Sequence, residues 1–322
     1  MNNTTIVTGL WDINRHNRPF EQYIENFQKF LNIPQNLYIY IPAELEDFVW
    51  QHRESHNTQV KILELQDIKN NYYAPFWDKT KEIRQQDEWI NRASWLSDSP
   101  QCKLEWYNPI VQSKMLMLND ARIINPFGSE YFYWLDAGLT NTVPEGHLTS
   151  ESVLDNLHTL TTSEELLFLS FPYDANNEIH GFYYPEINKY AGADVKYVCR
   201  GGLFGGHSDV IANANGDYYH TLLETLEAGF MGTEESIFSI MSYKNPFTYR
   251  RYALDSNGLI VKFTGEMIAK TAKLEEIDTS SIKTNFVKNK EVLAKVTKIV
   301  KTNVYMLTFN MPEQLTHTIN TM

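Results

Sequence analysis

Three acidic residues stand where a carboxylate could take part in chemistry. Asp136 directly follows the aromatic run Tyr131–Leu135, and Glu234 and Glu235 open a predicted helix. A carboxylate at the end of an apolar strand is costly to bury unless it binds something, and hard divalent cations prefer oxygen ligands. A carboxylate beside a sugar ring also stabilises an oxocarbenium-like transition state. Asp136 is therefore a candidate metal or nucleotide ligand, and either glutamate is a candidate catalytic carboxylate.

Each of these acids also has a structural explanation. Asp136 can close its strand in an Asx turn with Gly138. Glu234 and Glu235 follow Thr233, which can cap the helix, and carboxylates in a first turn favour the helix dipole. The residue types alone do not decide between the structural and the chemical roles.

Lys114 lies on the apolar face of a helix predicted from Pro109 to about Arg122. A lysine in such a stripe either extends its ammonium to water, with its stem along the apolar surface, or reaches a buried anion. The sequence leaves both interpretations open.

Four glycines, Gly201, Gly202, Gly205 and Gly206, end the strand-like run that begins at Val195, and we expect a tight turn there. Glycines let a backbone approach a ligand closely, but they also form bulges and hairpin turns. No Lys-Ser or Lys-Thr pair follows them, and their spacing differs from the dinucleotide fingerprint. These differences exclude a phosphate-binding loop of the ATPase type and a dinucleotide site.

The composition narrows the classes of function. The chain of 322 residues carries a net charge of −12, which argues against a broad nucleic-acid-binding surface and against attraction to an anionic membrane. Its two cysteines, Cys102 and Cys199, indicate neither a disulfide framework nor a zinc cluster. No run of about 18 apolar residues predicts a membrane span. We therefore expect a soluble, cytoplasmic protein.

Predicted strands alternate with predicted helices from the first residues onward. The strand-like runs lie at 4–9, 37–42, 60–65, 130–136 and 166–171. This alternation predicts an α/β fold, with a mostly parallel central sheet flanked by helices in a single large domain. The irregular segment 66–108 is a long insert of the kind that often carries substrate contacts.

The composition changes after about Ile260. We expect the main domain at 1–260, a lysine-rich helical or linker segment at 261–301, and a C-terminal strand and tail at 302–322. The last segment either begins a second α/β domain or packs onto the first domain as a terminal strand.

Several motifs in a fixed order resemble the HtrL/YibB family, which belongs among the GT-A-type glycosyltransferases. The motifs are IVTGLWDINR, which ends at Arg15 and is followed by Arg18, then NPIVQSK ending at Lys114, NPFGSEYFYWLDAGL containing Asp136, RGGLFGG, and GTEES. The resemblance covers roughly residues 4–255. It implies a GT-A-like domain that uses a nucleotide-sugar donor.

The stretch GGLFGG, followed by a helix and then EES, is similar to the corresponding stretch of the blood-group A/B transferases. Those enzymes retain the anomeric configuration, and the second acid of their pair lies beside the anomeric carbon. The matched residue here is Glu235, with Glu234 as its neighbour. Those enzymes also carry an Asp-x-Asp motif, whereas the stretch that begins at Asp136 lacks the second aspartate. The resemblance implies a retaining hexosyl- or pentosyltransferase and leaves its metal dependence open.

These observations lead to one hypothesis and two rivals. A glycosyltransferase would move a sugar from a nucleotide-sugar donor to a saccharide or other hydroxyl acceptor, with Glu235 and Glu234 as the catalytic pair and Asp136 holding Mn²⁺ or Mg²⁺. The expected donor-binding residues are Thr8, Arg15, Lys114, Asp136, Gly138, Gly201 and Gly202. The rivals are a catalytically inactive carbohydrate- or nucleotide-binding protein of the same fold, and a nucleotidyltransferase. A nucleic-acid acceptor fits the net charge poorly.

Overall fold

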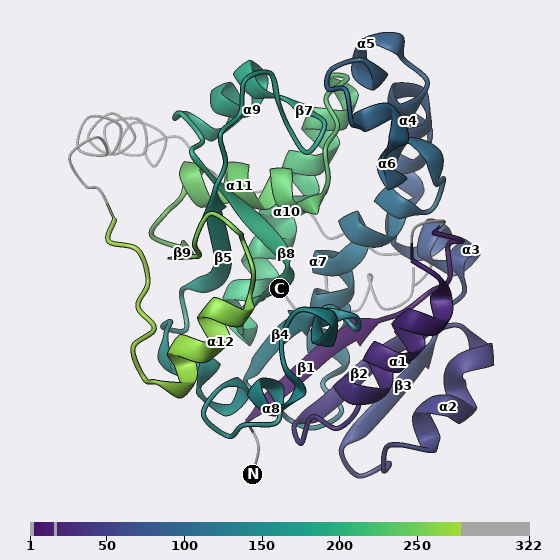
Figure 1. Ribbon diagram of the computed structural model, residues 1–322, viewed down its shortest axis with the longest axis vertical. Helices are drawn as coiled ribbons and strands as arrows, with labels where there is room; N and C mark the ends of the chain where they lie inside the picture. Colours follow the sequence, from purple (N-terminus) through teal and green to yellow (C-terminus); the bar gives the residue numbers. More distant parts are fainter. Residues whose placement is uncertain (1–2, 16–17, 278–322) are drawn as a thin grey trace, which may run out of the picture. The chain divides into compact units, whose positions relative to one another are not determined.

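The computed structural model describes residues 3–15 and 18–277, and the compact unit to which nearly all of them belong ends at Glu275. Its centre is a seven-stranded sheet with the order β3-β2-β1-β4-β8-β5-β9 (Figure 1). The strands are β1 Thr4–Gly9, β2 Asn36–Ile41, β3 Thr58–Ile62, β4 Tyr131–Leu135, β5 Leu166–Pro172, β8 Tyr197–His207 and β9 Tyr249–Ala253. Neighbouring strands pair in parallel, except that β8 is antiparallel to β4 and β5. The expected α/β fold with a mostly parallel sheet is confirmed.

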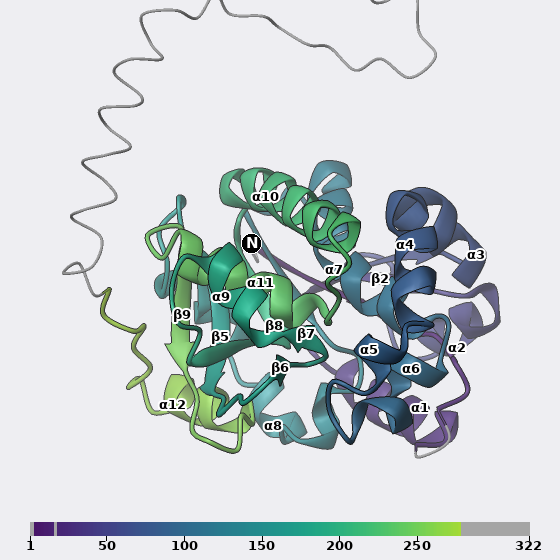
Figure 2. The ribbon, with the colours of Figure 1, turned by 90° about the horizontal axis from the view of Figure 1, so that it is seen from above.

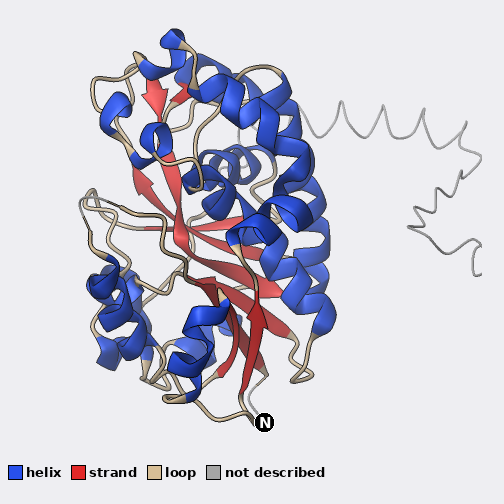
Figure 3. Ribbon diagram, turned by 90° about the vertical axis from the view of Figure 1, so that its right-hand side faces the viewer, coloured by secondary structure: helices blue, strands red, loops and turns tan. Residues whose placement is uncertain are grey.

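Helices cover both faces of this sheet. One layer contains α7 (Tyr107–Ile124), α10 (Ser208–Glu227) and α11 (Glu234–Lys244), and the other contains α1 (Phe20–Phe30), α8 (Glu145–Leu148) and α12 (Val261–Ile268). Ile6 and Val7 are neighbours in β1, yet Val7 packs with the first layer and Ile6 with the second. Figure 2 shows α7 and α10 on one side of the sheet and α8 and α12 on the other, and Figure 3 shows the strands between helices. Burial on both faces explains why the central strands are continuous apolar runs.

Most of the remaining elements are short. They are η1 (Ala43–Leu45), α2 (Glu46–Trp50), α3 (Leu65–Ile68), the π-helix η2 (Lys69–Tyr73), α4 (Ala74–Arg84), α5 (Asp87–Ile90), η3 (Leu96–Asp98), α6 (Pro100–Lys103), η4 (Leu139–Asn141), η5 (Leu154–Thr159), α9 (Tyr184–Ala191) and the two-stranded hairpin of β6 (Glu178–Ile179) and β7 (Phe182–Tyr183). The expected insert at 66–108 is therefore a series of short helices, and it buries Phe76 and Trp89 in the core.

The glycines between Gly201 and Gly206 lie inside β8 rather than in a turn. Gly205 has a φ of 152°, and a Cβ there would lie 2.2 Å from the carbonyl oxygen of Phe132 in β4. The pairing of β8 with β5 changes register next to Phe168, as in a bulge. The expected tight turn is wrong, because β8 continues through all four glycines. Gly205 and Gly206 pair with β4 on one side and β5 on the other, and the carbonyl oxygen of Gly202 accepts from the N–H of Asp136. This irregularity in the pairing is compatible with the bulge interpretation.

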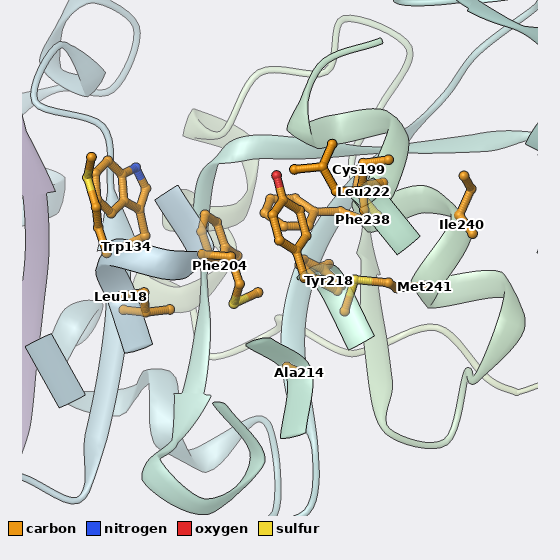
Figure 4. Close-up of a cluster of buried hydrophobic side chains, with 14 of the residues drawn as sticks. Leu118, Trp134, Cys199, Phe204, Ala214, Tyr218, Leu222, Phe238, Ile240 and Met241 are labelled. Carbon is orange, nitrogen blue, oxygen red and sulfur yellow. The ribbon is translucent and has the colours of Figure 1, made fainter. Parts of the chain in front are cut away.

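A cluster of aromatic rings packs β8 against α10 and α11 (Figure 4). The ring centroids of Phe204 in β8 and Phe238 in α11 are 4.6 Å apart, and Tyr218 of α10 lies 5.3 Å from Phe238. All three side chains are fully buried. This packing fixes α11 against the sheet, and α11 begins with the two glutamates.

The compact unit extends to Glu275, beyond the boundary expected near Ile260. Phe263 and Met267 of α12 are buried in the core, so α12 belongs to this unit. The segment 278–322, which contains the expected C-terminal strand and tail, lies outside the described residues. Among the helices that the structure describes, none combines the length and the apolar character needed to cross a membrane.

Candidate functional site

A cavity of about 460 Å³ opens at the carboxyl edge of the parallel strands. Its walls come from the segments that follow β1, β4 and β9, from the first half of β8, and from α1, α7 and the start of α11. Loops after parallel strands meet at this edge of an open α/β sheet, and ligands commonly bind there. The charged residues that line the cavity are Asp12, Arg15, Arg18, Lys114, Asp136, Arg200 and Glu235. Residues from distant parts of the chain therefore form one charged site.

The ammonium of Lys114 joins two of the expected acids. Its Nζ lies 2.8 Å from Asp136 Oδ1 and 2.8 Å from Glu234 Oε1, and it donates to the carbonyl oxygen of Gly201 at 3.2 Å. Burial alone would lower the pKa of Lys114, but the two carboxylates outweigh it and raise that pKa. Of the two interpretations of Lys114, contact with a buried anion is therefore the one observed, and the anions are carboxylates of the protein.

Glu234 lies behind Lys114, and its side chain is only 5% exposed. Burial raises the pKa of Glu234, contact with Lys114 lowers it, and the charge of Glu235 raises it again, with a balance at about 7. The pKa of Glu234 is raised although Lys114 lies beside it, because the cost of burying the carboxylate exceeds the effect of the ammonium. The ammonium has an oxygen partner for each of its three protons, which favours the charged form of Lys114.

Two amides of α7 hold the start of α11 in place. Asn108 and Gln112, one helical turn apart, donate their side-chain N–H groups to the carbonyl oxygen of Gly232 at 3.0 and 2.9 Å. Thr233 is the N-cap residue of α11, but its hydroxyl makes no capping hydrogen bond. The expected side-chain cap is therefore not observed, and the clamp from α7 sets the position of the glutamates.

The missing side chain of Gly201 makes room for Glu234. A Cβ on Gly201 would lie 2.0 Å from Glu234 Oε1 and 2.7 Å from Glu234 Cδ. The backbone N–H of Gly201 donates to Glu235 Oε1 at 2.9 Å, and its carbonyl oxygen accepts from Lys114. Gly201 therefore organises both glutamates from behind the cavity, while its neighbour Gly202 lines the cavity itself.

Glu235 presents an ionised carboxylate at the wall of the cavity. Oε2 lies 2.9 Å from His180 Nδ1, and Oε1 lies 3.8 Å from Arg200 Nη1. The His180 contact lacks the alignment of a hydrogen bond, and it is an ion pair when the imidazole is protonated. Burial would raise the pKa of Glu235, but His180, Arg200 and the N–H of Gly201 lower it to about 2. Glu235 is therefore a fixed negative charge at neutral pH.

His180 is a site residue that the sequence motifs do not predict. It occupies the two-residue turn between β6 and β7, where His180 and Gly181 have φ values of 51° and 88°. A type I′ hairpin turn requires positive φ at both positions. The His-Gly pair between apolar Ile179 and Phe182 is a weak sequence signal for such a turn. The turn directs the imidazole towards Glu235.

Arg200 is the second site residue that sequence reasoning did not single out, although it is the first residue of the RGGLFGG motif. Its Nε donates to the carbonyl oxygen of Gly258 at 2.9 Å, and its guanidinium lies 4.5 Å from the ring centroid of Phe171. Arg200 therefore connects the loop that follows β9 to the carboxylate of Glu235.

Some of the other expected binding residues line the cavity and some do not. Arg15 and Gly138 line the cavity, and Arg15 Nη1 donates to the hydroxyl of Tyr23 at 2.8 Å. Thr8 does not line it, because this residue is fully buried inside β1. Of the expected nucleotide contacts, Thr8 and Gly201 are therefore the two that the structure places outside the cavity lining.

A divalent metal fits poorly at Asp136. Mg²⁺ takes oxygen ligands in near-octahedral geometry, usually one or two carboxylates with phosphates and water. Asp136 Oδ1 already lies 2.8 Å from the Lys114 ammonium and accepts from Trp134 Nε1 at 2.7 Å. Within residues 3–15 and 18–277, no group of three or more His, Cys, Asp or Glu side chains is arranged to hold a metal ion. The one carboxylate assigned to Mn²⁺ or Mg²⁺ is thus already in contact with a cation of the protein, the ammonium of Lys114.

The contact between His180 and Glu235 should make stability depend on pH. Glu235 lowers the free energy of the imidazolium, so the pKa of His180 is raised despite its burial. A raised folded-state pKa stabilises the fold fully below the unfolded value of about 6.5, and this stabilisation is lost as the pH rises through the folded value. We expect His180→Asn to lose about 2 kcal/mol at pH 5.5 and clearly less at pH 9, measured by urea unfolding.

Asparagine suits this substitution because Asn-Gly is a favoured sequence for a type I′ turn, so its backbone effect should not vary with pH. The matched control is His56→Asn, since His56 pairs with Glu54 at an exposed site. A loss at His180 that is the same at both pH values would show that the imidazole is not charged by Glu235.

Among solved structures, one similar chain is core-mannan synthase A (CmsA/Ktr4) from Aspergillus fumigatus in its Mn/GDP form. The TM-score is 0.45 and the sequence identity is 8%, and the alignment covers 86% of this chain and 75% of that chain. No curated protein matches the sequence.

A family match covers the first half of the chain. The profile of the family described as "bacterial protein of unknown function (HtrL_YibB)" matches residues 2–162. This range contains Lys114 and Asp136, and it ends before Glu234 and Glu235. The match therefore supports the HtrL/YibB part of the resemblance and does not extend to the likeness with the blood-group A/B transferases. The chain belongs to the HtrL_YibB family.

Proposed function

We propose that this protein is a glycosyltransferase that moves a sugar from a nucleotide-sugar donor to a saccharide or another hydroxyl acceptor. The observation that carries the proposal is the charge arrangement of the cavity, where Arg15, Lys114 and Arg200 share one space with the ionised carboxylate of Glu235. A departing nucleoside diphosphate needs nearby positive charge. A sugar with oxocarbenium character needs a nearby carboxylate. One cavity supplies both.

In this proposal Glu235 stabilises the developing sugar cation or attacks it as a nucleophile. A carboxylate with a pKa of about 2 is a weak base, so the role of general base for the acceptor hydroxyl suits it less well. This property favours retention of the anomeric configuration. Glu234 contributes indirectly, because it positions Lys114 and does not itself line the cavity.

The donor would lie along the carboxyl edge of the sheet. Arg15, Lys114 and Arg200 would face its diphosphate, and the backbones of Gly138 and Gly202 would border it, since neither glycine puts a side chain into the cavity. Asp136 would orient Lys114 through their 2.8 Å contact.

A donor panel tests the proposal. The protein is incubated with UDP-glucose, UDP-galactose, UDP-N-acetylglucosamine, GDP-mannose and ADP-heptose, with and without oligosaccharide acceptors, and nucleoside diphosphate release is measured. We expect release from at least one donor, and proton NMR of the product gives its anomeric configuration. Nucleotide binding without release from any donor would favour the inactive binding protein. Formation of pyrophosphate from a sugar phosphate and a nucleoside triphosphate would favour the nucleotidyltransferase.

A further inference from the structure

The Lys114 ammonium occupies a point where three oxygen atoms converge. Asp136 Oδ1, Glu234 Oε1 and the carbonyl oxygen of Gly201 lie 2.8, 2.8 and 3.2 Å from its Nζ. Two carboxylate oxygens and a carbonyl oxygen are also the kind of ligand set that Mg²⁺ and Mn²⁺ prefer. These three oxygen atoms therefore form a cation site, and the ammonium of Lys114 occupies it.

A metal ion and this ammonium would compete for the same oxygens. A divalent ion within bonding distance of Asp136 would stand within a few ångströms of Lys114, and like charges at that separation repel strongly away from bulk water. The side chain of Lys114 is 7% exposed, and its stem lies on α7, which packs against the sheet. The lysine therefore has little room to withdraw.

We propose that Lys114 takes the place of the divalent cation and that the site binds the diphosphate of its donor without a metal ion. This inference rests on the proposed function. Lys114 lines the cavity together with Arg15, Arg18 and Arg200. These arginines supply N–H donors in the fork geometry that suits phosphate oxygens, while Lys114 acts as a fixed point charge. Together they supply the positive charge that a metal ion would otherwise bring.

Calorimetric titration with GDP, UDP, ADP and CDP tests the inference. In EDTA at least one of them should bind the wild-type protein, and Mn²⁺ should change its Kd by less than about threefold. Lys114→Met keeps the side-chain volume, removes the charge and should raise Kd about tenfold or more. Lys61→Met is the matched control, because Lys61 also pairs with a carboxylate, that of Asp120, and does not line the cavity. If Lys114→Met does not fold, Lys114→Met/Glu234→Gln, which removes one unpaired charge, takes its place.

A second measurement needs no nucleotide. Lys114→Ala leaves the oxygens of Asp136, Glu234 and Gly201 around a vacated space. We expect this variant to bind Mn²⁺, seen as a loss of the EPR signal of free Mn²⁺. The wild-type protein and Lys114→Ala/Glu234→Gln should leave that signal unchanged.

The outcomes separate the inference from the proposed function. Nucleotide binding that requires Mn²⁺, Mn²⁺ binding by the wild-type protein, or a Lys114→Ala variant that binds no Mn²⁺ would overturn the inference and leave the transferase proposal standing. Equal Kd values for Lys114→Met and Lys61→Met would do the same. A folded wild-type protein that binds none of the four diphosphates, with or without Mn²⁺, would overturn both.

Discussion

Replacing Glu235 with glutamine should lower kcat about a hundredfold or more and leave donor binding nearly unchanged. Glutamine keeps the side-chain size and can still accept from the N–H of Gly201, but it removes the charge that faces His180 and Arg200. An oxocarbenium-like transition state would lose its nearest negative charge, whereas the ground-state donor would keep its phosphate contacts. Steady-state kinetics give kcat, and calorimetry gives the donor Kd.

Two further variants, Glu186→Gln and Glu234→Gln, distinguish the effect of a carboxylate in the cavity from the effect of a carboxylate in the first turn of a helix. Glu186→Gln removes an acid from the first turn of α9, outside the cavity lining, and should cost at most about 1 kcal/mol of stability with no change in kcat. Glu234→Gln should lower kcat less than Glu235→Gln, because Glu234 lies behind Lys114. If Glu235→Gln behaves like Glu186→Gln, the glutamate is structural and the reacting carboxylate must be another residue of the cavity.

The central strands could be predicted because each is a short apolar run buried on both faces, as Ile6 and Val7 illustrate. The extent of β8 through its glycines could not be predicted in the same way. Its four glycines have weak strand propensity, and they favour a turn when only local sequence is considered. Pairing of Gly205 and Gly206 with β4 and β5 on both sides, with Gly205 against the backbone of Phe132, overrides that local preference.

The site was predictable where a charged residue interrupts an apolar pattern. Lys114 and Asp136 both stand out for that reason, and both line the cavity. Their mutual contact was not predictable, because it depends on how α7 packs against β4. His180 was not predictable either, since it reaches Glu235 from a hairpin turn that is distant in the sequence. The prediction of a bound metal ion depended on the carboxylate of Asp136 alone. The sequence could not show that the ammonium of Lys114 contacts that carboxylate.

Gly201→Ala should destabilise the fold by about 3 kcal/mol, because the added methyl group would occupy the space of the buried Glu234 carboxylate. The new Cβ would stand 2.0 Å from Glu234 Oε1 and 2.7 Å from Cδ, so Glu234 would have to leave Lys114. Urea unfolding with an unchanged m-value measures the loss. The control is Gly216→Ala in α10, where an added Cβ meets no atom within 4 Å. That substitution should stabilise the protein by about 0.5–1 kcal/mol.

A double-mutant cycle identifies the cause of that loss. Glu234→Ala removes the atoms that the new methyl group would strike, so Gly201→Ala/Glu234→Ala should be more stable than the sum of the two single effects by about 1–3 kcal/mol. Such coupling would show that a side chain at position 201 is excluded by the carboxylate of Glu234, and not by a ligand that approaches the backbone of Gly201. Additive effects would mean that Glu234 can move aside without cost. The contact between Glu234 and Lys114 would then be too weak to hold the ammonium at the wall of the cavity.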